Sequence, residues 1–111
     1  MPIMSILNQA HGGLPLKATF TSPADGPVCF VLAGSVWSAT PNQMIGVVLE
    51  LDGKAIGSAS IYSNATSTHR AVVPSYIAVN LAYGPHTVTL VPLNPVTTSD
   101  LNDLFDVALV Y

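Results

Sequence analysis

Short runs of hydrophobic residues recur along the whole chain, and clusters of turn residues separate them. The segment 16–22 shows the pattern most clearly, because Leu16, Ala18 and Phe20 alternate with polar residues, as in a strand with one face in a core. Short strands at this spacing, with turn signals between them, are typical of an all-β sandwich or barrel. We therefore expect eight strands and no helix, over residues 16–22, 28–37, 44–51, 54–62, 69–73, 76–83, 86–91 and 104–111.

Two of these segments carry more specific information. Asp52-Gly53 separates two strands, and both residues tolerate the positive φ that a two-residue hairpin turn requires. The strand expected over 28–37 is apolar on both faces as far as Gly34. A strand of this kind is covered on both sides, once by the partner sheet and once by something else. We expect the second cover to be another subunit.

Composition supports this expectation of self-association. Only 8% of the residues are charged and 50% are hydrophobic, whereas an average soluble domain is about 25% charged. Three basic and six acidic side chains cannot cover the large surface of a small domain. The sequence therefore predicts that identical chains cover part of one another.

The same composition excludes two classes of partner. Lys17, Lys54 and Arg70 are the only Lys and Arg residues, and they are far apart in the sequence. Nucleic-acid binding and adhesion to anionic membranes both need clustered cations, so we expect neither. The first residues lack a basic region and a sustained apolar stretch, so they do not form a signal peptide. We expect the protein in the cytoplasm, or released by a route that needs no such signal.

Length and organisation predict one domain over residues 1–111, in which residues 1–15 are irregular or form an edge strand. Two segments also resemble a known family. The segment 83–90, Tyr-Gly-Pro-His-Thr-Val-Thr-Leu, looks like a strand entry common in β-sandwiches. The segment 103–111 resembles the final strand of jelly-roll domains of the tumour-necrosis-factor and complement-C1q type. That resemblance, over about the last third of the chain, implies a ten-strand jelly roll and a homotrimer with this strand in its interface. The expected fold class is an antiparallel, jelly-roll-like β-sandwich of about eight to ten strands.

Signatures of catalysis are missing from the sequence. It contains no glycine-rich phosphate loop, no serine elbow and no His-Glu-x-x-His motif. Glu50 is the only glutamate, and Cys29 lies in an apolar run, where a cysteine acts as a small buried hydrophobe. We therefore expect no enzyme and no cofactor.

One end of the predicted sandwich suggests ligand binding. Because strands 44–51 and 54–62 are antiparallel, the loops that precede the first and follow the second lie at the same end. An aromatic face with amide, hydroxyl and arginine donors suits a neutral sugar. We expect a glycan site there, and the candidate residues are Trp37, Tyr62, Asn64, His69 and Arg70. Two alternatives stay open: ordinary loops with a tryptophan at the rim of the core, or a trimeric structural protein that binds no small ligand.

A second stretch suits a metal less specifically. Asp100, Asn102 and Asp103 concentrate oxygen ligands of the kind that Ca²⁺ prefers. The stretch lacks the EF-hand pattern and fits a turn or a capped helical bend equally well. The spacing of the three histidines does not indicate that they meet at a metal, and the expected role of His86 is that of a hydrogen-bonded residue at a strand end.

Overall fold

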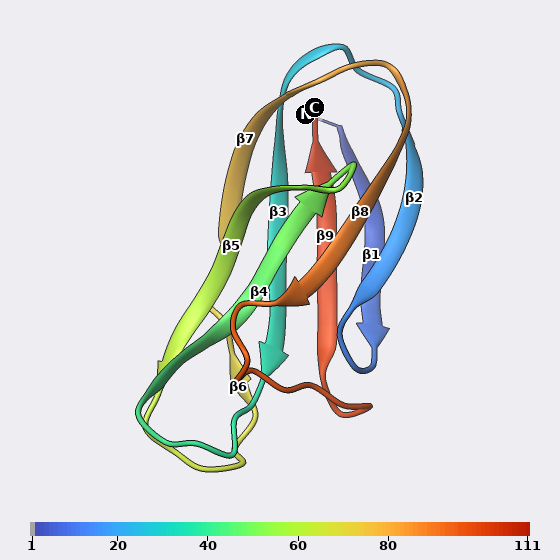
Figure 1. Ribbon diagram of the computed structural model, residues 1–111. Coiled ribbons are helices and arrows are strands. Elements are labelled where there is room, and N and C mark those ends of the chain that lie inside the picture. The colour runs from blue at the N-terminus through green and yellow to red at the C-terminus, as the bar shows by residue number, and fades with distance from the viewer. Residues whose placement is uncertain (1) are drawn as a thin grey trace.

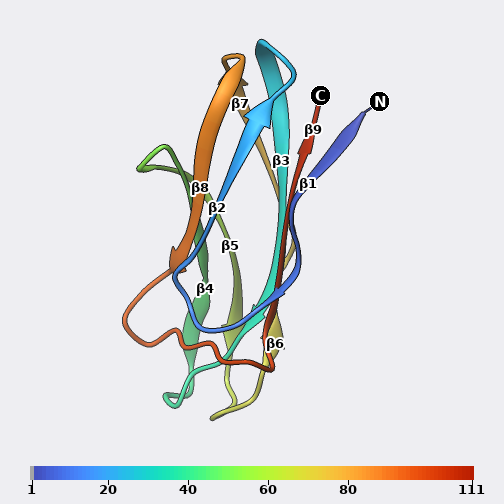
Figure 2. The same cartoon turned by 90° about the vertical axis from the view of Figure 1, so that its right-hand side faces the viewer.

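Nine strands in two antiparallel sheets form the molecule, and the two sheets pack face to face (Figures 1 and 2). The computed structural model describes residues 2–111. Within those residues there is no helix, and so none that could span a membrane. The strands are β1 (Ile3–His11), β2 (Leu16–Ser22), β3 (Gly26–Val36), β4 (Gln43–Leu51), β5 (Lys54–Ser63), β6 (Arg70–Ala71), β7 (Ser75–Leu81), β8 (Gly84–Pro92) and β9 (Leu104–Val110).

The order of the strands brings the two ends of the chain together. One sheet has the order β1-β9-β3, and β3 then pairs with β7 along its first part and with β6 at its end. The other sheet has the order β2-β8-β4-β5. Both termini lie at the same end of the sandwich in Figure 1. This architecture confirms the expected jelly-roll-like β-sandwich.

The eight strands expected from the alternation are all present, and β1 is the edge strand that the sequence analysis left open as one of two alternatives for residues 1–15. It forms one edge of its sheet beside β9, with two register shifts along the pairing. Gln9 within it has a φ of 49°, a left-handed conformation that interrupts regular alternation. These irregularities explain why the segment lacks a clear period of two.

The core lies between the sheets and is built from the inward residues of the alternation. Phe30 and Leu32 of β3, Leu49 of β4, Leu90 of β8 and Phe105 of β9 are completely buried. Burying a side chain of this size contributes about 1.5–3 kcal/mol. The outer side chains of β3 are also apolar, as expected, but they are only half-buried in the single chain.

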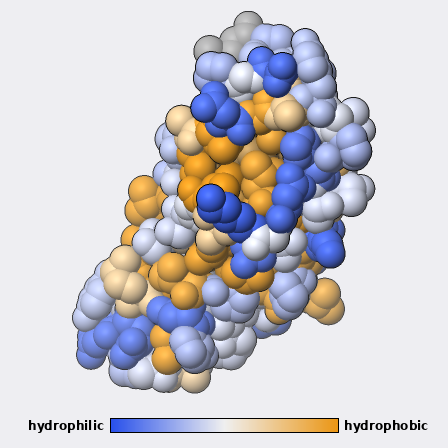
Figure 3. Space-filling view, turned by 45° about the horizontal axis from the view of Figure 1, so that its top comes forward, coloured by the Kyte–Doolittle hydropathy of each residue, from blue (hydrophilic) through white to orange (hydrophobic). Residues whose placement is uncertain are grey.

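Hydrophobic surface remains on the outside of the single chain. Figure 3 brings forward the β2-β8-β4-β5 sheet and the end that carries the termini, and hydrophobic side chains gather in the middle of this view with hydrophilic ones around them. This distribution is what the scarcity of charged residues leads one to expect.

Two local features of the fold depend on a glycine. Asp52 and Gly53 have φ angles of 51° and 86°, which confirms the hairpin turn between β4 and β5. At Gly57 of β5 a side chain comes close, because an added Cβ would lie 2.6 Å from Cδ1 of Ile77 on β7. Gly57 therefore lets the edges of the two sheets approach each other.

Candidate functional site

Three loops meet at the end of the sandwich that is remote from the termini (Figure 1). They are residues 37–42, 64–69 and 93–103. Trp37 and Thr98 exchange backbone hydrogen bonds of 2.9 and 2.8 Å, and Ser67 N donates to Ser38 O at 2.7 Å. The antiparallel pairing of β4 with β5 places the first two loops together, as the sequence suggested. The third loop joins them because it leads from β8 into β9.

A buried carboxylate organises this end. Asp103 is completely buried, and its Oδ1 accepts hydrogen bonds from Ser35 Oγ and His69 Nδ1, each at 2.7 Å. Its Oδ2 accepts from the backbone N–H of Asp100 at 2.9 Å. A buried charge persists where donors surround it in this way. Asp103 therefore ties β3, the segment before β6 and the last loop into one unit.

Electrostatics at His69 follow from this contact. The hydrogen bond to Asp103 raises the pKa of His69 above its usual value, and partial desolvation opposes that effect. The ring of Trp37 packs on that of His69, with 6.0 Å between centroids. Nε2 of His69 faces Asp100 Oδ2 at 3.9 Å.

The five residues proposed as a glycan site do not form one continuous contact set. Trp37 and His69 touch, and Arg70 Nη2 donates a long hydrogen bond of 3.4 Å to Asn64 Oδ1. Tyr62 is half-exposed and donates to Asn42 Oδ1 at 3.3 Å. All five lie on or beside the three loops, but the hydrogen bond of Tyr62 goes to Asn42, the last residue of the first loop, and not to Trp37, the first.

Two buried donors at this end have no acceptor among residues 2–111. They are the indole Nε1 of Trp37 and Nε of Arg70. A buried N–H without a partner costs about 1–3 kcal/mol, so such groups are rare and need an explanation. Both belong to residues that the sequence singled out for ligand binding.

The acidic stretch behaves as a turn with one buried member. Asp100 Oδ1 accepts from the backbone N–H of Asn102 at 2.8 Å, and Asp103 N donates to Asp100 O at 3.0 Å. Both oxygens of Asp103 already accept from protein donors. Calcium binding there stays a prediction.

Sequence reasoning kept the acidic stretch and His69 apart, and it missed Ser35. The structure brings the acidic stretch, His69 and Ser35 together. For Ser35, strand pairing offers one indication of this position. Once β3 and β9 are paired so that Gly34 faces Phe105, Ser35 comes next to the residues that precede β9. The position of His69 had no such signal, because irregular loops carry it there.

A second ionic pair lies towards the other end of the sandwich. His86 Nδ1 donates to Asp52 Oδ2 at 2.6 Å, and its Nε2 donates to Ala82 O at 2.8 Å. The hydrogen bond to Asp52 raises the pKa of His86, and the contact with Ala82 raises it further. The same bond to His86, with that from Thr87 N, lowers the pKa of Asp52. The structure confirms that His86 is a hydrogen-bonded residue at a strand end.

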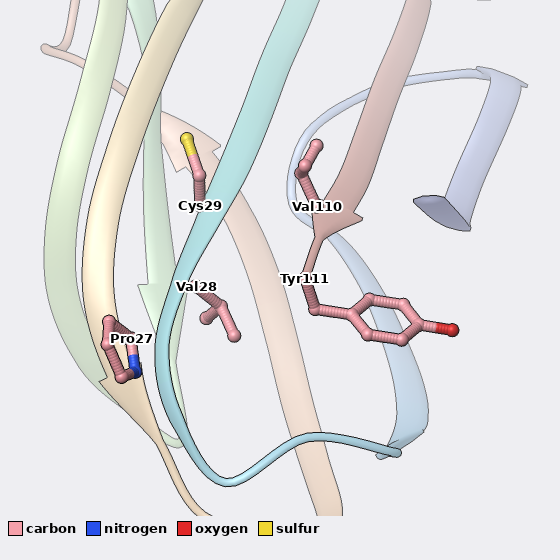
Figure 4. Close-up of a pocket in the computed structure, with 5 residues that line it drawn as sticks. All are labelled: Pro27, Val28, Cys29, Val110 and Tyr111. Atoms are coloured by element: carbon pink, nitrogen blue, oxygen red, sulfur yellow. The ribbon is translucent and has the colours of Figure 1, made fainter. Parts of the chain in front are cut away.

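Two surface hollows lie away from the three loops. One of about 310 Å³ is apolar and opens on the outer side of β3 and β9, where Cys29 pairs with Val110 and Tyr111 extends from the strand end (Figure 4). The other, of about 570 Å³, lies on the outer face of the opposite sheet. There Thr89 stands between Lys17 and Glu50 on the neighbouring strands.

No protein-family model matches the chain, and no curated protein matches its sequence. Solved structures do share its fold. The CBM36-1 domain of a multidomain xylanase, from the hindgut metagenome of Trinervitermes trinervoides, is 16% identical with a TM-score of 0.55, over 99% of this chain and 97% of that one. The EclA C-terminal domain, a sugar-binding protein, is 19% identical with a TM-score of 0.51, over 97% of this chain and 76% of that one.

A third structure is CBM35 from Cellvibrio japonicus Abf62, which is 12% identical with a TM-score of 0.50, over 99% of this chain and 94% of that one. At such low identities the likeness is one of fold. None of the three is a domain of the tumour-necrosis-factor or C1q type, so the jelly-roll class is confirmed while that particular resemblance is not. The chain is a jelly-roll-like β-sandwich that shares its fold with these three solved structures.

Proposed function

We propose that the protein is a non-catalytic glycan-binding module, and that the three loops around Trp37 and Arg70 form its binding site. The fold supports the proposal, since two structures of similar architecture are named as the CBM36-1 domain of a xylanase and as a sugar-binding protein. Folds host many functions, however, so the site has to carry the argument.

The unpaired donors of Trp37 and Arg70 are the observation that carries it. An indole N–H and a guanidinium N–H, both buried without an acceptor among residues 2–111, are donors that an oxygen atom from outside the chain would satisfy. Sugar hydroxyl and ring oxygens are acceptors of this kind. A ligand would reach these buried nitrogens only if the loops moved, and the exposed amide of Asn64 beside Arg70 would supply a further polar contact.

A glycan array with wild-type protein and two variants tests this proposal. Trp37→Ala removes the aromatic face and one donor, and binding to the glycans that wild type retains should fall at least tenfold. Tyr83→Ala is the matched control, because Tyr83 is 68% exposed and follows β7, towards the other end of the sandwich. A folded wild-type protein that binds no glycan, or a Tyr83 variant as impaired as the Trp37 variant, would refute the proposal.

We further propose that the module acts as a homo-oligomer through the outer face of the β1-β9-β3-β7 sheet. Two rows cross this face: Ile3, Val110, Cys29 and Ala78, then Ser5, Ala108, Val31 and Tyr76. Neither row contains a charge, and Tyr76 and Ile3 are 74% and 67% exposed. A second copy of the chain is the occupant that the low charge content of the whole sequence favours. A homo-oligomer presents several copies of a weak glycan site, and simultaneous binding at several of them raises the overall avidity.

The same apolar face favours the second candidate function, a structural protein that assembles without a small ligand. The trimer expected from the sequence is compatible with either candidate function. A tight oligomer that binds no glycan would support the structural role, whereas glycan binding that depends on Trp37 would support the first proposal.

A further inference from the structure

We infer that His69 and Asp100 form a binding site for a divalent transition metal of the zinc class. The inference is independent of glycan binding, and it differs from the calcium site expected from the acidic stretch alone. Ligand atoms of His69, Asp100 and Asp103 all lie within 4.8 Å of one another. Nothing in the spacing of the residues indicated that a histidine would join this stretch.

Each of the two proposed ligands has one atom engaged and one atom free. His69 uses Nδ1 to donate to Asp103, so its neutral ring carries a lone pair on Nε2. Asp100 uses Oδ1 to accept from Asn102 N, and its Oδ2 faces His69 Nε2. In this neutral form of the ring the two acceptor atoms repel each other, and either a proton on Nε2 or a metal cation between them removes the repulsion.

The distance between these atoms suits a metal better than a proton. Nε2 and Oδ2 are 3.9 Å apart, which is too far for a hydrogen bond. Zinc bonds of about 2.0–2.1 Å at a tetrahedral angle place neighbouring ligand atoms about 3.3 Å apart. Asp100 has a 43% exposed side chain, so a closure of roughly 0.6 Å meets little resistance.

Asp103 would hydrogen-bond to the metal-bound His69 and would not itself bind the metal. A carboxylate that accepts the other ring N–H of a metal-bound histidine fixes the tautomer and makes the ring a better ligand. Asp103 is completely buried and already holds His69 in this way. The side chains of His69 and Asp100 are 37% and 43% exposed, so solvent can deliver the ion and complete its coordination with water.

The mixed ligand set selects the class of metal. Imidazole nitrogen suits Zn²⁺, Ni²⁺, Co²⁺ and Cu²⁺, whereas Ca²⁺ and Mg²⁺ take oxygen ligands. Bound metal would clip the last loop to the segment before β6. That clip would stabilise the end of the sandwich on which Trp37 lies.

The single tryptophan reports on this site directly, because the rings of Trp37 and His69 are 6.0 Å apart. We would titrate the full chain, without an oligohistidine tag, with Ni²⁺ and Co²⁺ at about pH 8, where histidine ligands are deprotonated. We expect saturable quenching of Trp37 fluorescence at one metal per chain, and competition by Zn²⁺, which does not quench. Calorimetry with Zn²⁺ alone measures the same affinity without a fluorescence readout.

Two variants and two controls locate the site. His69→Asn keeps a donor for Asp103 but deletes the Nε2 ligand, and Asp100→Asn weakens the second ligand. We expect each to weaken binding roughly tenfold or more. His11→Asn and His86→Asn should bind as wild type does, and circular dichroism checks that every variant is folded. The inference is wrong if wild type does not bind, if His69→Asn binds equally well, if a control loses binding to the same extent, or if Ca²⁺ competes as strongly as Zn²⁺.

Discussion

The imidazole of His86 donates to the carboxylate of Asp52 at 2.6 Å and so joins the β4–β5 turn to the start of β8. Its other ring nitrogen faces the carbonyl oxygen of Ala82 at 2.8 Å. Both partners are acceptors, so both ring nitrogens must donate, and the geometry favours the imidazolium. This pair makes the stability of the fold depend on pH.

The sign of that dependence follows from the two pKa shifts. The pKa of His86 is raised on folding, so its contribution is complete below its usual value of about 6.5 and is lost as pH rises through the higher folded value. The pKa of Asp52 is lowered, so its contribution is complete above about 3.8 and is lost as pH falls through the lower folded value. We therefore expect the pair to stabilise most between those two values.

Asp52→Asn tests this expectation, because Asn tolerates the same positive φ and still accepts from Thr87 N. Asp52 is half-exposed, so the loss is expected to be small, about 0.5–1 kcal/mol near pH 5.5, and smaller near pH 8.5. Urea unfolding at both pH values measures this loss as the difference in free energy of unfolding between wild type and variant. Because His69 titrates in both proteins, its contribution cancels in that difference. A free-energy difference that grows with pH would contradict the prediction.

Asp103→Asn should destabilise the fold by about 1–3 kcal/mol, because an amide cannot accept from Ser35, His69 and Asp100 N at once. Thermal or urea unfolding checks this. Asp25→Asn is the matched control, since Asp25 is exposed, and it should change stability by less than about 0.5 kcal/mol. Equal effects of the two substitutions would show that Asp103 does not organise the loops.

Gly57→Ala should cost about 1–3 kcal/mol, because the new Cβ would clash with the side chain of Ile77. In the double variant with Ile77→Ala the clash is gone, so the combined loss should be smaller than the sum of the two single losses. Gly13→Ala is the control, since its added Cβ would meet Ser99 O at an ordinary 3.6 Å. Additive losses would mean that Gly57 and Ile77 do not touch.

Val31→Lys should convert the proposed oligomer to a single chain, because it places a charge in the middle of the apolar outer face. Thr19→Lys adds the same charge to an exposed position of the other sheet and should leave the assembly unchanged. Sedimentation at low protein concentration measures both. A wild-type protein that sediments as one chain would end the proposal of self-association.

The parts of the fold that alternation and turn chemistry encode locally were predictable. The strand from Leu16 to Ser22 begins and ends where the alternation of hydrophobic and polar residues indicated, and Asp52-Gly53 forms the expected turn. The sequence could not decide whether residues 1–15 form an edge strand or an irregular segment, because the bulges of β1 and the left-handed Gln9 break the period of two. The sequence also led us to expect that the candidate loops share one end, since that follows from the pairing of adjacent strands.

The contact between His69 and Asp103 could not be foreseen in the same way. The two residues are 34 positions apart, and both lie where the chain leaves regular strand geometry. No periodicity describes how such loops fold against each other. The burial of Asp103 was equally hidden, because an aspartate in a polar stretch is normally exposed.

Calorimetric titration of the strongest array glycan into wild type and Arg70→Ala tests the central claim most directly. Arg70 carries one of the two unpaired buried donors, and Glu50→Gln probes the hollow on the other sheet. We predict that the affinity falls at least tenfold in the folded Arg70 variant and is unchanged in the Glu50 variant. Undiminished binding by Arg70→Ala, or binding that depends on Glu50 instead, would contradict a glycan site at the three loops.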